Sequence, residues 1–131
     1  MESSSAGIDI VSIARMGQAL KRELFLKRVF TGPELDYAGS RRRPEKHLAG
    51  RFAAKEAVVK ALSRGILSGI SMKDIEVVNG VDGRPVVRLG PASAEAAKGR
   101  PVHLSISYTE EFAFAFVMLG RGAPGRPARN R

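Results

Sequence analysis

The sequence predicts an α+β fold in which an antiparallel sheet packs against one long helix. The strongest strand signal is residues 112–119 (FAFAFVML), where Phe occupies every second position before the run becomes continuously apolar. Residues 75–78 and 86–89 are short β-branched runs separated by Asn79-Gly-Val-Asp-Gly83, which is typical of a hairpin. The longest helix signal begins at Pro44 and ends near Gly65, where a C-cap is expected.

The N-terminal residues predict a strand followed by a basic helix. Ile and Val alternate loosely along residues 7–13, so Asp9 shares one face of this strand with Val11 and Ile13. One carboxylate is therefore expected among apolar side chains. Residues 14–28 predict a single basic amphipathic helix, with apolar residues at helical spacing among Arg and Lys: Met16, Leu20 and Leu24.

Five shorter segments complete the expected order of elements. Thr31 and Glu34 have the spacing of a capping box, which predicts a short helix through Tyr37. The others are a basic loop, an Ala-rich helix, an alternating strand and the loop before the last strand, at residues 39–43, 91–98, 102–107 and 108–111.

The composition limits the class of protein. The 131 residues suit one domain, which we expect over residues 1–120. A hydrophobic fraction of 44% with 27% charged residues excludes a wholly disordered chain, and the lack of Cys excludes disulfides, thiolate metal sites and cysteine nucleophiles. No apolar run is long enough to span a membrane and MESSSAG is unlike a signal peptide, so a cytoplasmic protein is expected.

The formal net charge of +9 predicts an anionic partner. Residues 121–131 hold four Arg and no acidic residue among Pro and Gly, so they are expected to form a disordered basic tail. Five of the nine net positive charges therefore belong to the rest of the chain. The tail is interpreted either as a solvated end without a role or as a weak contact for an anion.

The long helix carries charged residues in unusual places. At about 100° per residue, Arg51 and Lys55 fall inside its apolar arc. Such cations either snorkel to the margin of the helix or meet a buried anion. Glu56 and Lys60 lie one turn apart at the margin, where they are spaced for an i,i+4 ion pair. From spacing alone, snorkelling cations and a surface ion pair are the favoured interpretation.

Asp9 favours a second interpretation of the same helix. A carboxylate on the first strand and Glu56 beside three cations together predict a hard oxygen site for Mg²⁺ and a polyphosphate. Mg²⁺ commonly uses one or two carboxylates and completes its octahedron with water and phosphate oxygens. Two carboxylates are therefore enough for such a site.

The motifs resemble those of a known family, and they occur in its order along the chain. They are Gly7-Ile-Asp-Ile10 with Arg15, Arg28-Val-Phe-Thr31 with Glu34-Leu35, Leu48-Ala-Gly-Arg-Phe-Ala-Ala-Lys-Glu-Ala57 with Lys60-Ala61, Ile75-Glu76 with Gly83-Arg-Pro85, and His103-Leu-Ser-Ile-Ser107. The chain is similar to the short, acyl-carrier-protein-synthase type of 4′-phosphopantetheinyl transferase, from about Gly7 to Leu119. The helix motif is the most specific of these.

The resemblance implies the fold of that family and its activity. Its members transfer the 4′-phosphopantetheine group of coenzyme A to a serine of an acyl carrier protein, with Mg²⁺, and release adenosine 3′,5′-bisphosphate. Both partners are acidic, which suits the positive charge of this chain. Members generally assemble as homotrimers with active sites between subunits. The carrier protein and pathway, such as fatty acid biosynthesis or a specialised route, are left open.

The resemblance also implies roles for the catalytic residues. Asp9 and Glu56 would be the Mg²⁺ ligands at the pyrophosphate of coenzyme A, and Lys60 would contact the phosphate under attack. The reaction needs such charges because negative charge builds up on the pyrophosphate oxygens. The base that deprotonates the serine is either Glu56 or a metal-bound water, and both stay open.

A wider set of residues is implied to contact coenzyme A: Arg42, Arg43, Arg51, Lys60, Gly65, Ser105, Ser107 and Tyr108. The Arg residues suit the adenosine 3′-phosphate, because a guanidinium binds phosphate in a bidentate way. The alternatives are a solvated loop for residues 41–43, a helix C-cap for Gly65 and ordinary polar strand positions for the two serines. Both serines are expected to face the long helix.

Four residues of the predicted first helix match positions at which the family binds its carrier protein: Arg15, Arg22, Phe25 and Arg28. A basic rim around one aromatic anchor is reasonable chemistry for an acidic partner. The alternative is a solvated helix face.

One departure from the family concerns Tyr108, which stands where the family usually has a His. A tyrosine donates a hydrogen bond but carries no positive charge near neutral pH. A second hypothesis is therefore a family member that binds coenzyme A or a carrier protein without efficient transfer. Nucleic-acid binding is the least favoured hypothesis, because only the net charge points to it.

Overall fold

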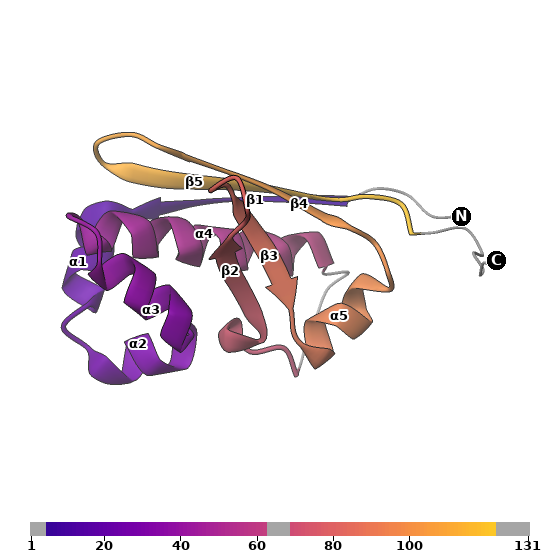
Figure 1. Cartoon of the computed structure of the whole chain (residues 1–131), viewed down its shortest axis with the longest axis horizontal. Helices are drawn as coiled ribbons and strands as arrows, with labels where there is room; N and C mark the ends of the chain where they lie inside the picture. The colour runs from indigo at the N-terminus through magenta and orange to yellow at the C-terminus, as the bar shows by residue number, and fades with distance from the viewer. Residues whose placement is uncertain (1–4, 63–68, 123–131) are drawn as a thin grey trace.

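The computed structural model describes residues 5–62 and 69–122 of the chain. Four helices follow the first strand, and the other strands come in antiparallel pairs, as expected for an α+β protein, which confirms the predicted fold class (Figure 1). The elements are, in order, β1 (Ser5–Ser12), α1 (Ile13–Ala19), α2 (Glu23–Val29), α3 (Gly32–Gly39), α4 (Pro44–Leu62), the 3₁₀ turn η1 (Met72–Asp74), β2 (Ile75–Asn79), β3 (Pro85–Leu89), α5 (Pro91–Ala97), β4 (Val102–Tyr108) and β5 (Phe112–Leu119). None of the helices in these ranges is long and apolar enough to cross a membrane.

A three-stranded antiparallel sheet with the order β1-β5-β4 lies along the long helix α4 (Figure 1). Side chains alternate between its faces, so Ala115 and Val117 are buried against the helix, while Phe116 and Met118, each the next residue along the strand, are exposed. Asp9 lies opposite Ala115 in this sheet and therefore faces α4. The first strand thus carries one carboxylate to the side of the sheet that the helix covers.

Gly7 allows β1 to lie directly on the backbone of α4. A Cβ atom at this position would collide with the carbonyl oxygen of Ala57, and it would lie 2.9 Å from the backbone nitrogen of Ala61. Only glycine has no Cβ atom, so any other residue would push the strand away from the helix. This close approach sets the position of Asp9, two residues further along the same face.

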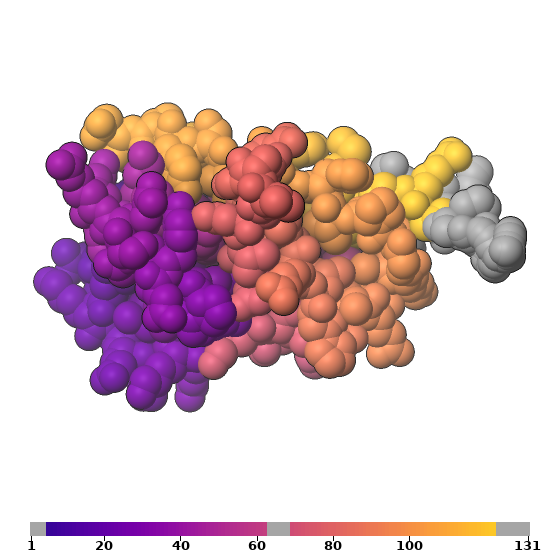
Figure 2. Space-filling view, viewed as in Figure 1, coloured from indigo at the N-terminus to yellow at the C-terminus, as the bar shows by residue number. Residues whose placement is uncertain are grey.

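Two buried clusters hold the described residues together. The first lies between α4, the sheet and the β2–β3 hairpin, and it includes Val58, Val77 and Val117. The second joins α1, α2, α3 and α4 around Phe30 and Leu48. Figure 2 shows the hairpin on the visible surface between the N-terminal helices and the segment that contains α5. Both clusters meet α4, so this helix is the central element of the fold.

The predicted helix over residues 14–28 is wrong, because the structure has two helices with a turn between them. The first begins one residue after the strand ends, with Ser12 as its cap, so Ile13 belongs to α1 and not to β1. Leu24 was expected in one apolar stripe and is instead 71% exposed. The turn lets α2 present Val29 to the core, which a straight continuation of α1 would not do.

Most other elements are confirmed with small changes of boundary. The capping box of Thr31 and Glu34 is formed, and the hairpin, α5 and the last two strands occur where expected. The description of α4 stops at Leu62, so its expected end near Arg64 and Gly65 lies outside the described residues. The same holds for residues 123–131 of the expected tail.

Candidate functional site

A cavity of about 920 Å³ lies between β1, α1, α2 and α4. Its lining includes the two carboxylates predicted to bind Mg²⁺, Asp9 and Glu56, and three of the predicted carrier-protein contacts, Arg15, Arg22 and Phe25. One concave surface therefore brings together a carboxylate from β1, a carboxylate from α4 and the basic residues of α1 and α2. We call it the carboxylate cavity.

The two carboxylates of this cavity influence one another. Burial raises the pKa of Glu56 above its usual value of 4.5, the negative charge of Asp9 raises it further, and Lys60 opposes both effects. A cation placed beside both groups would relieve this repulsion. Within the described ranges no group of three or more His, Cys, Asp or Glu side chains forms a metal site. A pair of carboxylates fits an ion such as Mg²⁺, which takes its remaining ligands from water and phosphate.

Lys60 connects α4 to the first strand at the edge of the cavity. Its ammonium donates to Oδ1 of Asp9 at 2.9 Å and to the carbonyl oxygen of Ile8 at 3.0 Å. The expected i,i+4 pair with Glu56 is wrong for the described residues, where Lys60 pairs with Asp9 instead. The three residues predicted to be catalytic are thus brought together, with a half-exposed ammonium beside the two carboxylates.

The predicted carrier-protein contacts continue from the carboxylate cavity along α2. The guanidinium of Arg22 lies 5.2 Å from the centre of the Phe25 ring, a cation–π arrangement. A second cavity of about 550 Å³ is lined by these two residues and by Arg28. The four predicted residues therefore line two neighbouring cavities that share Arg22 and Phe25, and we call this joint surface the basic and aromatic groove of α1 and α2.

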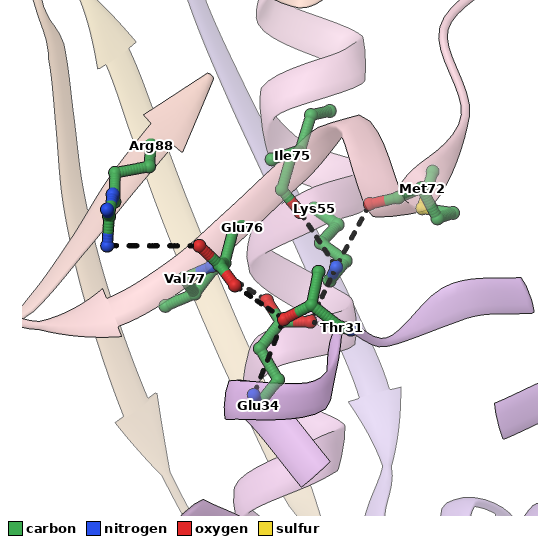
Figure 3. A network of polar contacts seen from close by, with 8 residues as sticks. All are labelled: Thr31, Glu34, Lys55, Met72, Ile75, Glu76, Val77 and Arg88. Carbon is green, nitrogen blue, oxygen red and sulfur yellow. Dashed lines mark hydrogen bonds and ion pairs between the residues drawn. The ribbon is translucent and has the colours of Figure 1, made fainter. Parts of the chain in front are cut away.

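Lys55 does not snorkel from α4, so this part of the sequence prediction is wrong. Its side chain is 0% exposed, and its ammonium donates to Oε1 of Glu34 at 2.8 Å and to the carbonyls of Met72 and Ile75 at 2.9 and 2.7 Å (Figure 3). Burial lowers the pKa of Lys55, while the carboxylate of Glu34 opposes the change. The buried anion allowed for in the sequence analysis is Glu34, on α3.

Arg51 is also buried, at 4% exposure, in a cluster on the other side of α4. Its Nη2 donates to Oδ1 of Asn79 at 2.9 Å, and its guanidinium lies 4.4 Å from the centre of the Tyr37 ring. Its Nε has no hydrogen-bond partner in the part of the chain that the structure describes. A buried guanidinium with an unused donor is a candidate anion site. Burial lowers the pKa of Arg51 from its usual value.

Tyr108 lies in the same cluster, at the end of β4. Its ring packs 6.3 Å from that of His47, and a Cβ atom at Gly50 would collide with its hydroxyl group. Gly50 on α4 therefore makes room for the phenol. Lys46 lies 4.9 Å from the centre of the Tyr108 ring, so the cluster combines aromatic rings with several positive charges.

The pH dependence of stability should report the environment of His47. Burial and the charges of Arg41, Arg51 and Lys46 lower its pKa below 6.5, so the folded protein takes up this proton at lower pH than the unfolded chain. The free energy of unfolding should therefore fall as pH falls from 6.5 through that lower pKa.

The check is urea unfolding at about pH 7.5 and about pH 5, with wild type compared against the His47→Gln variant. The wild type should lose more stability on acidification than the variant, which lacks the titrating group. An equal loss in the two proteins would contradict the prediction.

The carboxylate cavity and the Arg51 cluster lie near opposite edges of the three-stranded sheet, on the face that α4 covers. Asp9 is on β1 and Tyr108 is on β4, with β5 between these strands. Ser105 and Ser107 are exposed on the outer face, opposite Phe116 and Phe114, so the expectation that they face the long helix is wrong. The alternation along β4 explains this, because Leu104 and Ile106 are the residues that pack, partly buried, against the core.

The basic loop is divided between two regions. Arg41 lies 5.3 Å from the centre of the Tyr37 ring and so joins the Arg51 cluster. Arg43 instead pairs with Glu45 at 3.6 Å, and Arg42 is exposed. Gly65 lies outside the described residues. Arg41, which was not predicted as a site residue, is thus the loop residue that joins this cluster.

Tyr37, His47 and Asn79 were also missed by the sequence analysis. His47 lies one turn before Arg51 on α4, a spacing that was visible in the sequence. Asn79 is 28 positions from Arg51, and only the packing of the hairpin against α4 brings the two together. Its sole local signal was the Asn-Gly turn.

Comparison with known proteins supports a single family. The family model described as the 4′-phosphopantetheinyl transferase superfamily, ACPS, matches residues 5–117. The holo-[acyl-carrier-protein] synthase of Protochlamydia amoebophila is 43% identical over 114 residues, which cover 86% of this chain and 93% of the relative.

Two solved structures are similar over most of their length. The holo-(acyl-carrier-protein) synthase of Bacillus anthracis in complex with CoA (3′,5′-ADP) has a TM-score of 0.77 at 36% identity. The match covers 94% of this chain and 100% of the Bacillus anthracis chain. The Helicobacter pylori holo-[acyl-carrier-protein] synthase in complex with coenzyme A has a TM-score of 0.77 at 33% identity, covering 88% and 99%. The family model, the relatives and the shared fold show that the chain belongs to the holo-acyl-carrier-protein synthase family within the 4′-phosphopantetheinyl transferase superfamily.

Proposed function

We propose that this protein transfers the 4′-phosphopantetheine group of coenzyme A to a serine of an acyl carrier protein, in a Mg²⁺-dependent reaction that releases adenosine 3′,5′-bisphosphate. The main support is the carboxylate cavity, which joins Asp9 and Glu56 to the basic and aromatic groove of α1 and α2. An acidic carrier bound along that groove would present its serine next to the two carboxylates. The relatives named above as holo-[acyl-carrier-protein] synthases support the same activity.

The proposed reaction forms one bond and breaks one. The serine oxygen attacks the phosphorus that carries the pantetheine, the bond from that phosphorus to the bridging oxygen breaks, and the adenosine bisphosphate leaves with the electron pair. Asp9 and Glu56 would hold the Mg²⁺, which supplies positive charge to the pyrophosphate oxygens when bound. Lys60 would place its ammonium against the same oxygens, because it lies beside Asp9. The serine proton goes to Glu56 or to a water.

Arg51 is the proposed contact for the 3′-phosphate of coenzyme A, and its Nε, which has no partner within residues 5–62 and 69–122, supports this assignment. The remaining proposed cofactor contacts are those implied by the family resemblance: Arg42, Arg43, Gly65, Ser105, Ser107 and Tyr108. Because Arg51 and Asp9 lie toward opposite edges of the sheet, one coenzyme A molecule would contact both residues most readily across two copies of the chain.

We therefore include a homotrimer in the proposal. The outer face of the sheet offers an apolar surface for self-association, with Ile8 and Ile10 on β1 and Phe116 and Met118 on β5 all exposed. Replacing Phe116 with Glu should convert the assembly to monomers and reduce transfer, because a charge would enter the apolar contact. Sedimentation measurements on both proteins test this.

The control for this prediction is Val81→Glu, which adds the same charge at the exposed tip of the hairpin and should leave the assembly intact. A wild type that sediments as a monomer, or a Phe116→Glu variant that keeps its assembly, would contradict the proposed trimer.

The activity itself is tested by incubating the protein with coenzyme A, Mg²⁺ and an apo acyl carrier protein, then measuring the mass of the carrier. The proposal expects an increase by one phosphopantetheine group, which disappears when a chelator removes the metal. Coenzyme A binding without any increase on several carriers would favour the second hypothesis, a binding protein with Tyr108 in place of the usual His. We expect the reaction to take place in the cytoplasm, with neither membrane nor nucleic acid as a partner.

A further inference from the structure

Asn79 holds the guanidinium of Arg51 with a neutral acceptor. The amide oxygen of Asn79 accepts one hydrogen bond from Nη2 at 2.9 Å, and Tyr37 covers one face of the same group. Arg51 forms no ion pair with a carboxylate in residues 5–62 and 69–122, so its charge is not cancelled by a neighbour. An aspartate at position 79 would pair with the guanidinium and compete with any anion that binds there.

The strand that carries Asn79 is fixed against α4 by the buried pair of Glu34 and Lys55. Lys55 donates to the carbonyl oxygen of Ile75 at 2.7 Å, and Oε2 of Glu34 accepts from the backbone nitrogen of Val77 at 2.7 Å (Figure 3). Asn79 is the next residue on the same face of β2, since side chains alternate along a strand. The network therefore determines where the amide of Asn79 meets the helix.

The geometry points to Asn79 as a positioning residue for the Arg51 anion site. We propose that it aims the guanidinium so that Nε keeps no partner among the described residues, and that it thereby sets the preference of this protein for coenzyme A over 3′-dephospho-coenzyme A. This inference rests on the proposed function, in which Arg51 binds the 3′-phosphate. Asn79 acts through Arg51 and need not touch the ligand.

Calorimetric binding of two nucleotides tests the inference without relying on turnover. Adenosine 3′,5′-bisphosphate and adenosine 5′-monophosphate differ by the 3′-phosphate, so their affinity ratio measures how well that phosphate is recognised. In the Asn79→Ala variant this ratio should fall about tenfold, the size expected for one hydrogen bond to a charged group. Affinity for the monophosphate should stay unchanged.

Two further variants sharpen the test. Asn79→Asp keeps an acceptor oxygen in place but adds a charge, so it should lower the ratio more than Asn79→Ala does. Val81→Ala changes an exposed residue of the same hairpin and should leave the ratio at its wild-type value. In transfer assays the KM for coenzyme A should rise in the two Asn79 variants, while KM and kcat for 3′-dephospho-coenzyme A stay the same.

Arg51→Gln separates this inference from the proposed function. If Arg51→Gln leaves the affinity ratio unchanged, the assignment of the 3′-phosphate to Arg51 fails. If Arg51→Gln lowers the ratio but neither Asn79 variant does, the positioning role alone is overturned. An equal loss of affinity for both nucleotides in the Asn79 variants would also overturn it, because that result indicates a general structural defect.

Discussion

Replacing Glu56 with glutamine is expected to lower the rate of phosphopantetheine transfer by at least about 100-fold, because mutations of residues that only support metal ligands already cost 10–100-fold. Glutamine keeps the size of the side chain and removes its charge, so the carboxylate cavity would keep its shape and lose a Mg²⁺ ligand. The measurement is the initial rate of carrier modification at several Mg²⁺ concentrations, with calorimetry for the metal affinity.

The dependence on Mg²⁺ also decides between the two roles left open for Glu56. If Glu56 only holds the ion, raising the Mg²⁺ concentration should restore much of the rate, because the weakened site refills. If Glu56 is the base, saturating Mg²⁺ should leave the rate low. The control is Glu95→Gln, the same change at an exposed position of α5. Normal turnover by the Glu56→Gln variant at low Mg²⁺ would refute both roles.

The sequence predicts those elements whose signals are local. The capping box of Thr31 and Glu34 needs only a spacing of three residues, and the hairpin needs only the turn-forming stretch Asn79 to Gly83 between two β-branched runs. The division of residues 14–28 into two helices escapes such signals, because the turn is favoured by what Val29 contacts after folding. Helical spacing was present in the sequence, but tertiary packing decided where the helix stops.

Polar partners were predicted less well than elements, for a related reason. Glu34 was seen only as a cap, yet its second oxygen accepts from Val77 and its first also accepts from Lys55. Sequence spacing along α4 placed Lys55 and Arg51 in the apolar arc and could not name their partners, which come from α3 and β2. Asp9 and Glu56 were predicted as an oxygen site for Mg²⁺ from the residues alone, and the family motifs added their catalytic roles and that of Lys60.

The buried pair of Lys55 and Glu34 predicts a large loss of stability in the Lys55→Met variant. Methionine fills a similar volume but leaves the carboxylate of Glu34 buried without its counter-charge, and removing one partner of such a pair costs about 3–5 kcal/mol. The carbonyls of Met72 and Ile75 also lose their donor. The free energy of unfolding, measured in urea, should fall by that amount.

The matched control is Lys27→Met, which breaks an exposed pair with Glu23 on α2 and should cost at most about 1 kcal/mol. Adding Glu34→Gln to Lys55→Met should recover part of the loss, because a neutral amide is easier to bury unpaired than a carboxylate. The double variant should then lose less stability than the sum of the losses in the two single variants. If Lys55→Met costs no more than Lys27→Met, the buried pair does not stabilise the fold, and it could not be what holds β2 and Asn79 in place.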